Sequence, residues 1–112
     1  MRAETLKGHL DGLLLASLEA GPRHGYAIME ALRAGSDGQV DLPTGTIYPA
    51  LRRLERAGLL AGEWDEAGGR RRRTYSLTPA GRRALVAERG TWRDFSAAVT
   101  ALLEPAPRAV TS

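Results

Sequence analysis

The apolar positions in the first half of the chain recur at the spacing of amphipathic α-helices. This pattern predicts a first helix over residues 7–20, which Gly21 and Pro22 end, and a second over residues 25–34, which Gly35 ends. The apolar positions are Leu6, Leu10, Leu13, Leu14 and Leu18 for the first helix, and Ile28, Met29 and Leu32 for the second. Each helix therefore has one face suited to burial.

A third helix is predicted over residues 44–57. Its buried stripe consists of Ile47, Leu51 and Leu54, which stand at positions i, i+4 and i+7. Pro49 removes one backbone hydrogen bond within the first two turns. A helix that begins two residues later would place this proline nearer the first turn, where it is tolerated. The sequence leaves the two starts open.

The pattern then changes to the alternation of β-strands and returns to a helix. Strands are predicted over residues 59–64 and 72–77, with a turn-rich loop over residues 65–70 between them. A last helix follows over residues 79–103, because Thr78 is a good N-cap and a proline stands at the first helical position.

Three helices, a hairpin and a final helix, in this order, are typical of a winged helix-turn-helix protein. The expected fold class is mainly α with a small β-hairpin (α+β), with a long C-terminal helix after the winged domain. The expected domains are a DNA-binding winged helix over residues 1–78, whose N-terminal helix also lies at a dimer interface, a dimerisation helix over residues 79–104 and a disordered tail over residues 105–112.

Charge is unevenly distributed along the chain. The net charge is +3, but residues 52–83 hold nine arginines and four acids and so carry +5. Arginine presents a planar fork of donors that fits phosphates and guanine edges. The stretch therefore predicts binding to a polyanion, although charge alone is equally compatible with a solvated basic face.

Composition also limits the class of protein. The chain has no cysteine, which excludes disulfides and thiolate metal sites. Its N-terminus is charged and its apolar runs, such as residues 13–16, are too short to span a bilayer, so we expect a cytoplasmic protein. No nucleophile–base set or nucleotide loop is recognisable, so we expect neither an enzyme nor a cofactor. His9 with Asp11 is a weak metal-binding pair, and His24 is expected to cap or pack.

The third helix and the hairpin hold the residues expected to contact DNA. A recognition helix presents side chains near its N-terminus to base edges in the major groove, and a wing arginine contacts phosphates or the minor groove. Strand alternation sends two of the four consecutive arginines to each face, so not all four can touch DNA. The predicted DNA-binding residues are Thr44, Gly45, Thr46, Tyr48, Arg52, Arg53, Arg70, Arg71, Arg72 and Arg73.

The last helix carries a seam of the coiled-coil type. Leu85, Trp92 and Val99 are seven residues apart, and a companion set contains Glu88, Phe95 and Leu102. Such a seam has no evident partner within so small a domain, so we expect a two-fold homodimer that reads a near-palindrome. The predicted interface residues are Leu10, Leu14, Leu85, Trp92, Phe95, Val99 and Leu102.

Three segments carry a family resemblance: RHGYAI at residues 23–28, TGTIYPALRRLE at residues 44–55 and RTYSLT at residues 73–78. They resemble the phenolic-acid-decarboxylase-regulator (PadR) family of bacterial repressors, in its short form with one helix after the wing. The resemblance covers residues 6–103, and Pro43 departs from it where many members have a serine or asparagine cap. It implies dimerisation through the first and last helices and, in many members, release from DNA by small, often aromatic, molecules.

The resemblance also implies a site for an aromatic effector between the subunits. In some short members a tryptophan of the last helix faces a pore between the subunits and stacks on flat ligands. The corresponding ligand-binding residues here are Trp92, Phe95, Leu14 and Asp11. Two alternatives stay open: Trp92 and Phe95 can be plain dimer core, and the winged helix can be a protein-binding module.

Overall fold

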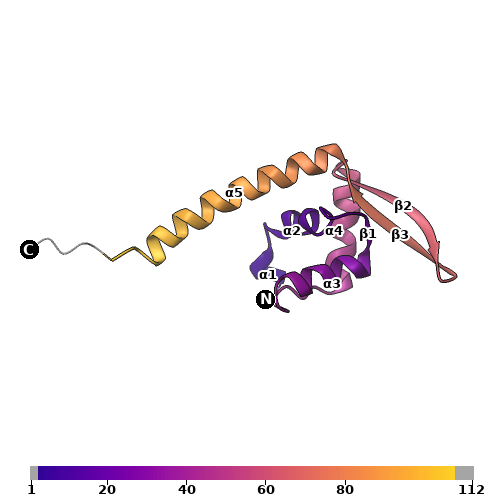
Figure 1. Cartoon of the computed structure of the whole chain (residues 1–112), viewed down its shortest axis with the longest axis horizontal. Helices are drawn as coiled ribbons and strands as arrows, with labels where there is room; N and C mark the ends of the chain where they lie inside the picture. The colour runs from indigo at the N-terminus through magenta and orange to yellow at the C-terminus, as the bar shows by residue number, and fades with distance from the viewer. Residues whose placement is uncertain (1–2, 108–112) are drawn as a thin grey trace, which may run out of the picture.

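The chain folds into a winged helix body from which one long helix projects. The computed structural model describes residues 3–107, without the side chains of Ala3 and Ala67. The elements are α1 (Ala3–Leu6), α2 (Leu10–Ser17), β1 (Arg23–His24), α3 (Gly25–Gly35), α4 (Thr44–Arg56), β2 (Leu60–Ala67), β3 (Arg70–Leu77) and α5 (Pro79–Leu103). Helices α1 to α4 gather into the body, the β2–β3 hairpin, hereafter the wing, leaves it on one side, and α5 extends to the other (Figure 1). The predicted fold class is confirmed.

The first predicted helix is wrong in its bounds because Gly8 interrupts it. Gly8 has a φ of +92°, a left-handed conformation that glycine adopts at little cost. The segment is therefore two helices, α1 and α2, with His9 at the N-cap of the second, and α2 ends at Ser17 instead of residue 20. The predicted bounds of α3 and α5 agree with the structure to within one residue.

Helix α4 begins at Thr44, so the earlier of the two predicted starts is the one observed. Pro43 caps it in an extended conformation without a side-chain hydrogen bond. Its carbonyl oxygen instead accepts from the backbone N–H groups of Thr46 and Ile47, at 3.0 and 3.1 Å. Pro49 lies inside the helix. Because proline has no backbone N–H, the carbonyl oxygen four residues earlier lacks its usual helical donor.

The core lies where α2, α3, α4 and the sheet meet. The largest fully buried side chains are Leu14, Leu15, Leu18, Ile28, Ile47, Leu51 and Leu54. The stripe predicted for α4 is thus confirmed. Tyr75 of β3 and Leu85 of α5 belong to the same cluster and join the wing and the long helix to the body.

The wing is longer, and its turn tighter, than predicted. Gly68 and Gly69 both have a left-handed φ, +60° and +76°, which is the requirement of a two-residue primed turn. The predicted loop over residues 65–70 is therefore mostly strand. The predictions also missed β1, which pairs antiparallel with β3 and gives a three-stranded sheet in the order β1-β3-β2. A two-residue strand is too short to show a period in the sequence.

Helix α5 starts as the sequence predicts. The Thr78 hydroxyl accepts from the backbone N–H of Gly81 at 3.0 Å and donates to the carbonyl oxygen of Gly58 at 2.6 Å. Pro79 occupies the first turn. Of the predicted tail, residues 105–107 are exposed and irregular, whereas residues 108–112 lie outside the described residues. Within residues 3–107, no helix has the length and apolar character required to cross a membrane.

Candidate nucleic-acid interface

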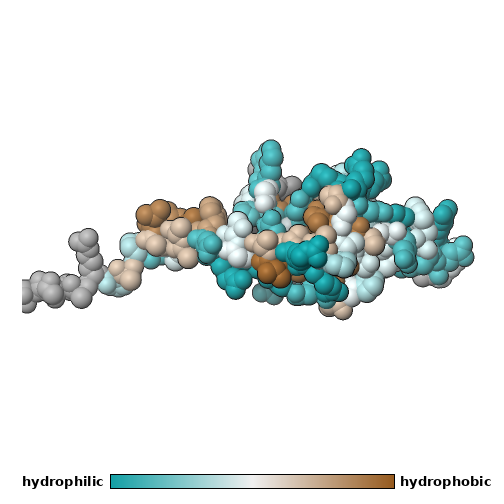
Figure 2. Space-filling model, turned by 90° about the horizontal axis from the view of Figure 1, so that it is seen from above, coloured by the Kyte–Doolittle hydropathy of each residue, from teal (hydrophilic) through white to brown (hydrophobic). Residues whose placement is uncertain are grey.

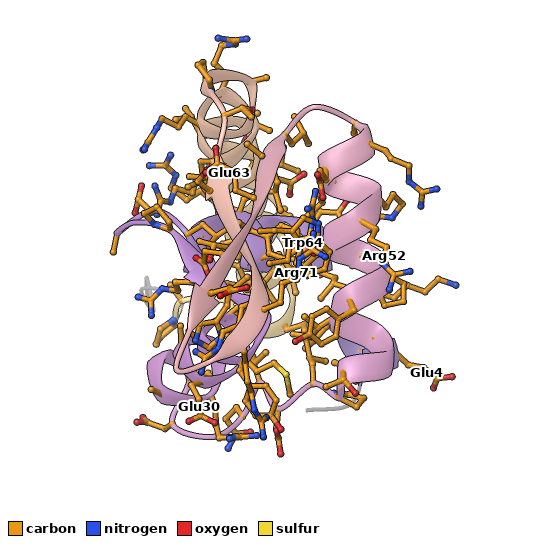
Figure 3. All side chains as sticks on the ribbon, turned by 90° about the vertical axis from the view of Figure 1, so that its right-hand side faces the viewer. Glu4, Glu30, Arg52, Glu63, Trp64 and Arg71 are labelled. Atoms are coloured by element: carbon orange, nitrogen blue, oxygen red, sulfur yellow. The ribbon has the colours of Figure 1, made fainter. Side chains whose placement is uncertain are left out.

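A groove of about 1280 Å³ lies between α4 and the wing, hereafter the α4–wing groove. It is lined by His24, Gly25, Tyr26, Tyr48, Arg52, Glu55, Arg56, Trp64, Arg70, Arg71, Arg72, Arg73 and Tyr75. Six of these residues are arginines and one is an acid, so the groove has a strongly positive lining. Figure 3 shows Trp64 and Arg71 of the wing between the hairpin and α4, the helix that carries Arg52. The structure thus brings the two predicted DNA-binding segments together on one surface.

The N-terminal part of α4 presents small and aromatic side chains at this surface. Thr44 and Gly45 are exposed, and Thr46 and Tyr48 are half-buried. The Tyr48 ring lies directly on Gly25: a Cβ at that position would be 2.6 Å from the Tyr48 hydroxyl. The absence of a side chain at Gly25 therefore makes room for the Tyr48 ring. Gly25 is part of the RHGYAI segment, but its contact with Tyr48 is visible only in the tertiary structure.

The three arginines of α4 have different surroundings. Arg52 and Arg56 are exposed and line the groove. Arg53 makes two hydrogen bonds to Asp11 of α2, at 2.8 and 2.5 Å, and these bonds raise the pKa of the Arg53 guanidinium. The predicted DNA contact Arg53 and the predicted ligand contact Asp11 are thus each other's partners, so binding of DNA or of a ligand by either side chain competes with this pair.

The four wing arginines divide between the two faces of the hairpin, as strand alternation predicts. On one face, Arg73 donates to Glu55 of α4, with Nε 3.3 Å from Oε1, and this bonding raises the pKa of Arg73. On the other face, Arg72 Nη1 lies 3.1 Å from His24 Nε2. Arg70 and Arg71, nearest the turn, are exposed. The wing tip therefore presents these two arginines to a ligand, whereas the other two are engaged with the body.

One residue of the interface, Trp64, was not singled out from the sequence. Trp64 of β2 is 57% exposed in the groove, and the guanidiniums of Arg71 and Arg73 lie over its ring at 4.6 and 5.2 Å from the centroid. The register pairs Trp64 with Arg73. That pairing is predictable only once the turn is placed at Gly68 and Gly69. His24 caps α3, as expected, by accepting from the Ala27 N–H at 3.3 Å.

The predicted interface residues on α2 and α5 fall into two groups. Leu14 and Leu85 are 0% and 3% exposed and pack within their own chain, so they offer no surface to a partner or a ligand. Leu10 and Val99 are half-buried, and Trp92, Phe95 and Leu102 are exposed. Figure 2 shows the resulting apolar surface near the outer end of α5. Next to it, the His9 ring lies 5.3 Å from that of Trp92 and 6.1 Å from that of Phe95.

Comparisons with known proteins agree with this geometry. The model of the transcriptional regulator PadR-like family matches residues 14–87. A PadR family transcriptional regulator from Eggerthella lenta is 36% identical, with a TM-score of 0.78 and coverage of 93% of this chain and 89% of that one. A transcriptional regulator from Clostridium thermocellum is 25% identical, with a TM-score of 0.84 and coverage of 90% and 99%.

A curated relative matches a shorter part of the chain. The transcriptional regulator Rv3488 of Mycobacterium tuberculosis is 43% identical over 67 residues. This match covers 60% of the present chain and half the length of Rv3488.

Proposed function

The chain belongs to the PadR-like family of transcriptional regulators, and on this premise we propose that it is a repressor that binds a near-palindromic operator as a homodimer. The observation that carries the proposal is the α4–wing groove. Its lining combines the exposed face of a helix-turn-helix recognition helix with an arginine-rich wing. We expect Arg52 and Arg56, which are exposed, to contact base edges or phosphates, and the exposed Arg70 and Arg71 to contact phosphates or the minor groove.

The homodimer part of the proposal rests on the exposed patch of α5. Trp92 and Phe95 are each 52% exposed and Leu102 is 82% exposed, which is unusual for side chains of this size on one helix. A second copy would cover the patch through the seam of seven-residue spacing. A two-fold dimer of this kind presents two α4 helices to successive major grooves, about 34 Å apart. In this scheme residues 1–78 bind DNA, with their N-terminal helix also at the dimer interface, and residues 79–104 dimerise through the exposed outer half of α5.

An effector site between the subunits is the regulatory part of the proposal. The rings of His9, Trp92 and Phe95 form a half-exposed aromatic cluster at the base of the patch. A flat aromatic molecule that stacks there in a dimer would change the spacing of the two recognition helices and release the operator. The protein would act in the cytoplasm, where bacterial DNA is found.

The test is a binding titration with the DNA upstream of the protein's own gene, against a scrambled duplex of equal length. Tyr48→Ala and Arg52→Ala are each expected to weaken operator binding by about 1–3 kcal/mol, because each removes a groove side chain from the recognition helix. Arg33→Ala is the matched control: Arg33 is half-buried on α3 and hydrogen-bonds Asp41 at 2.8 Å, away from the groove lining.

Circular dichroism should show an intact fold in all three variants. Operator affinity unchanged by both groove substitutions, or reduced equally by the control, would remove α4 from the interface. Equal affinity for the operator and the scrambled duplex would contradict sequence-specific repression.

A further inference from the structure

Like Tyr26, which is 63% exposed, Trp64 is a large aromatic side chain of the α4–wing groove that the fold leaves mostly exposed. Its neighbour in the same lining, Tyr75, is 2% exposed and belongs to the core, whereas Trp64 is 57% exposed. Trp64 contributes little to the hydrophobic core, so its contacts with charged groups describe its role better than its apolar area does.

Those contacts form a continuous stack from the recognition helix to the wing tip. Glu55 of α4 accepts from Arg73 of β3, whose guanidinium lies 5.2 Å from the centroid of the Trp64 ring. On the same ring, the Arg71 guanidinium lies 4.6 Å from the centroid. Both distances fall within the range of cation–π attraction. The order of groups is therefore Glu55, Arg73, Trp64, Arg71, with only Arg71 at the exposed end.

The backbone leaves room for this stack at one position. A Cβ on Gly62 would lie 2.7 Å from Arg73 Nε and 2.8 Å from Glu55 Oε1. Gly62 is on β2, two residues before Trp64 and therefore on the same face of the strand. Any larger residue would displace the ion pair, so the absence of a side chain at this position is what lets the inner end of the stack form.

We propose that Trp64 is a positioning residue for DNA binding: its ring holds the Arg71 guanidinium at a set distance from α4, ready for a phosphate. An unsupported arginine loses side-chain entropy when it is ordered on a ligand. Contact with the Trp64 ring restricts the Arg71 side chain already in the free protein, so less of this entropy is lost when DNA binds. The inference rests on the proposed DNA-binding function and adds to it a residue that acts through another residue.

Arg70 provides the internal comparison. It is also exposed, lines the same groove and is one residue away, but strand alternation turns it to the face of the hairpin opposite Trp64. Trp64 should therefore affect DNA binding through Arg71 and leave the contribution of Arg70 unchanged.

The experiment is a double-mutant cycle on operator affinity. Trp64→Leu, which keeps an apolar side chain but removes the aromatic face, is expected to weaken binding about five-fold. In an Arg71→Ala background the same substitution should have less than about a 1.5-fold effect, because the residue on which it acts is gone. In an Arg70→Ala background the five-fold effect should persist. Trp64→Phe, which retains a flat ring, should restore most of the affinity.

A full five-fold loss in the Arg71→Ala background would overturn the proposal, since Trp64 would then contact DNA itself or merely support the hairpin. Equal operator affinities for the Trp64→Leu and Trp64→Phe variants would also overturn the proposal, because an aromatic ring would then not be required.

A second measurement needs neither DNA nor a stable Trp64→Leu variant. In the free wild-type protein, the Arg71 Hδ resonances should be shifted upfield by the ring current of Trp64, and those of Arg70 should not. Normal Arg71 shifts would refute the stack. Failure of the wild-type protein to bind any operator, with the shift present, would refute the proposed function and leave the positioning geometry standing.

Discussion

The two halves of α5 carry one continuous apolar period, but they have different surroundings. Leu85, in the first half, is 3% exposed and packs into the core of its own chain. Leu102, in the second half and on the companion set of the same seam, is 82% exposed. The seven-residue spacing is identical in both halves. A seven-residue period therefore identifies the apolar face of a helix but not what covers that face.

The boundary between the halves is where the body ends. Glu19, just past α2, accepts from Arg89 at 2.6 and 2.7 Å, and a Cβ on Gly12 would touch Glu88 at 3.4 Å. His9, before the first residue of α2, reaches Trp92 and Phe95. Beyond these contacts α5 runs outward alone (Figure 1). The first half is thus part of the winged domain, and the second half is available to a partner.

The largest effect should come from a charge in the exposed half. Light scattering at micromolar concentration is expected to give twice the 12.1 kDa chain mass for the wild-type protein and 12.1 kDa for Trp92→Asp, because two carboxylates would be buried in the seam. Val86→Asp is the matched control: Val86 is 66% exposed on the first half of α5 and outside the seam, so that variant should remain a dimer. A dimeric Trp92→Asp variant, or a monomeric Val86→Asp variant, would break the comparison.

A smaller effect, of a different kind, is expected from the buried half. Leu85→Ala should lower the free energy of unfolding by about 2–4 kcal/mol, because it removes buried methyl groups and leaves a cavity. Urea denaturation at several protein concentrations measures the loss, which should be the same at each of them. A loss that disappears at high protein concentration would show that Leu85 acts in the dimer instead.

The smallest effect concerns the ion pair at the boundary. The hydrogen bond from Arg89 lowers the pKa of the Glu19 carboxyl below its ordinary value. A carboxyl whose pKa is lower in the folded state adds stability above its unfolded pKa and loses it as the pH falls through the folded pKa. Both side chains are about half exposed, so the contribution is small.

The melting temperature of Glu19→Gln measures this contribution. The variant should melt slightly below the wild type at neutral pH and together with it once the carboxyl is protonated in acid. A difference that stays constant from neutral to acid pH would exclude the ion pair as its source.

Local chemistry and apolar periods determined most elements from the sequence alone. Thr78 and Pro79 start α5 through interactions within the next turn, and Ile47, Leu51 and Leu54 define the buried stripe of α4 by their spacing. Such features need only neighbours a few residues away, which are visible in the sequence. The apolar face of α5 and the arginines of α4 and the wing were predictable for the same reason.

Tertiary structure decided which partner each side chain takes. Arg53 faces Asp11 across 42 residues, Arg73 faces Glu55 across 18, and Trp64 supports Arg71 only because the turn at Gly68 and Gly69 sets the register of the wing. Likewise, the apolar period of α5 does not indicate at which residue the contacts between α5 and the winged helix body end. Pairings of this kind depend on how the elements are placed in space, and short-range patterns hold no information on that placement.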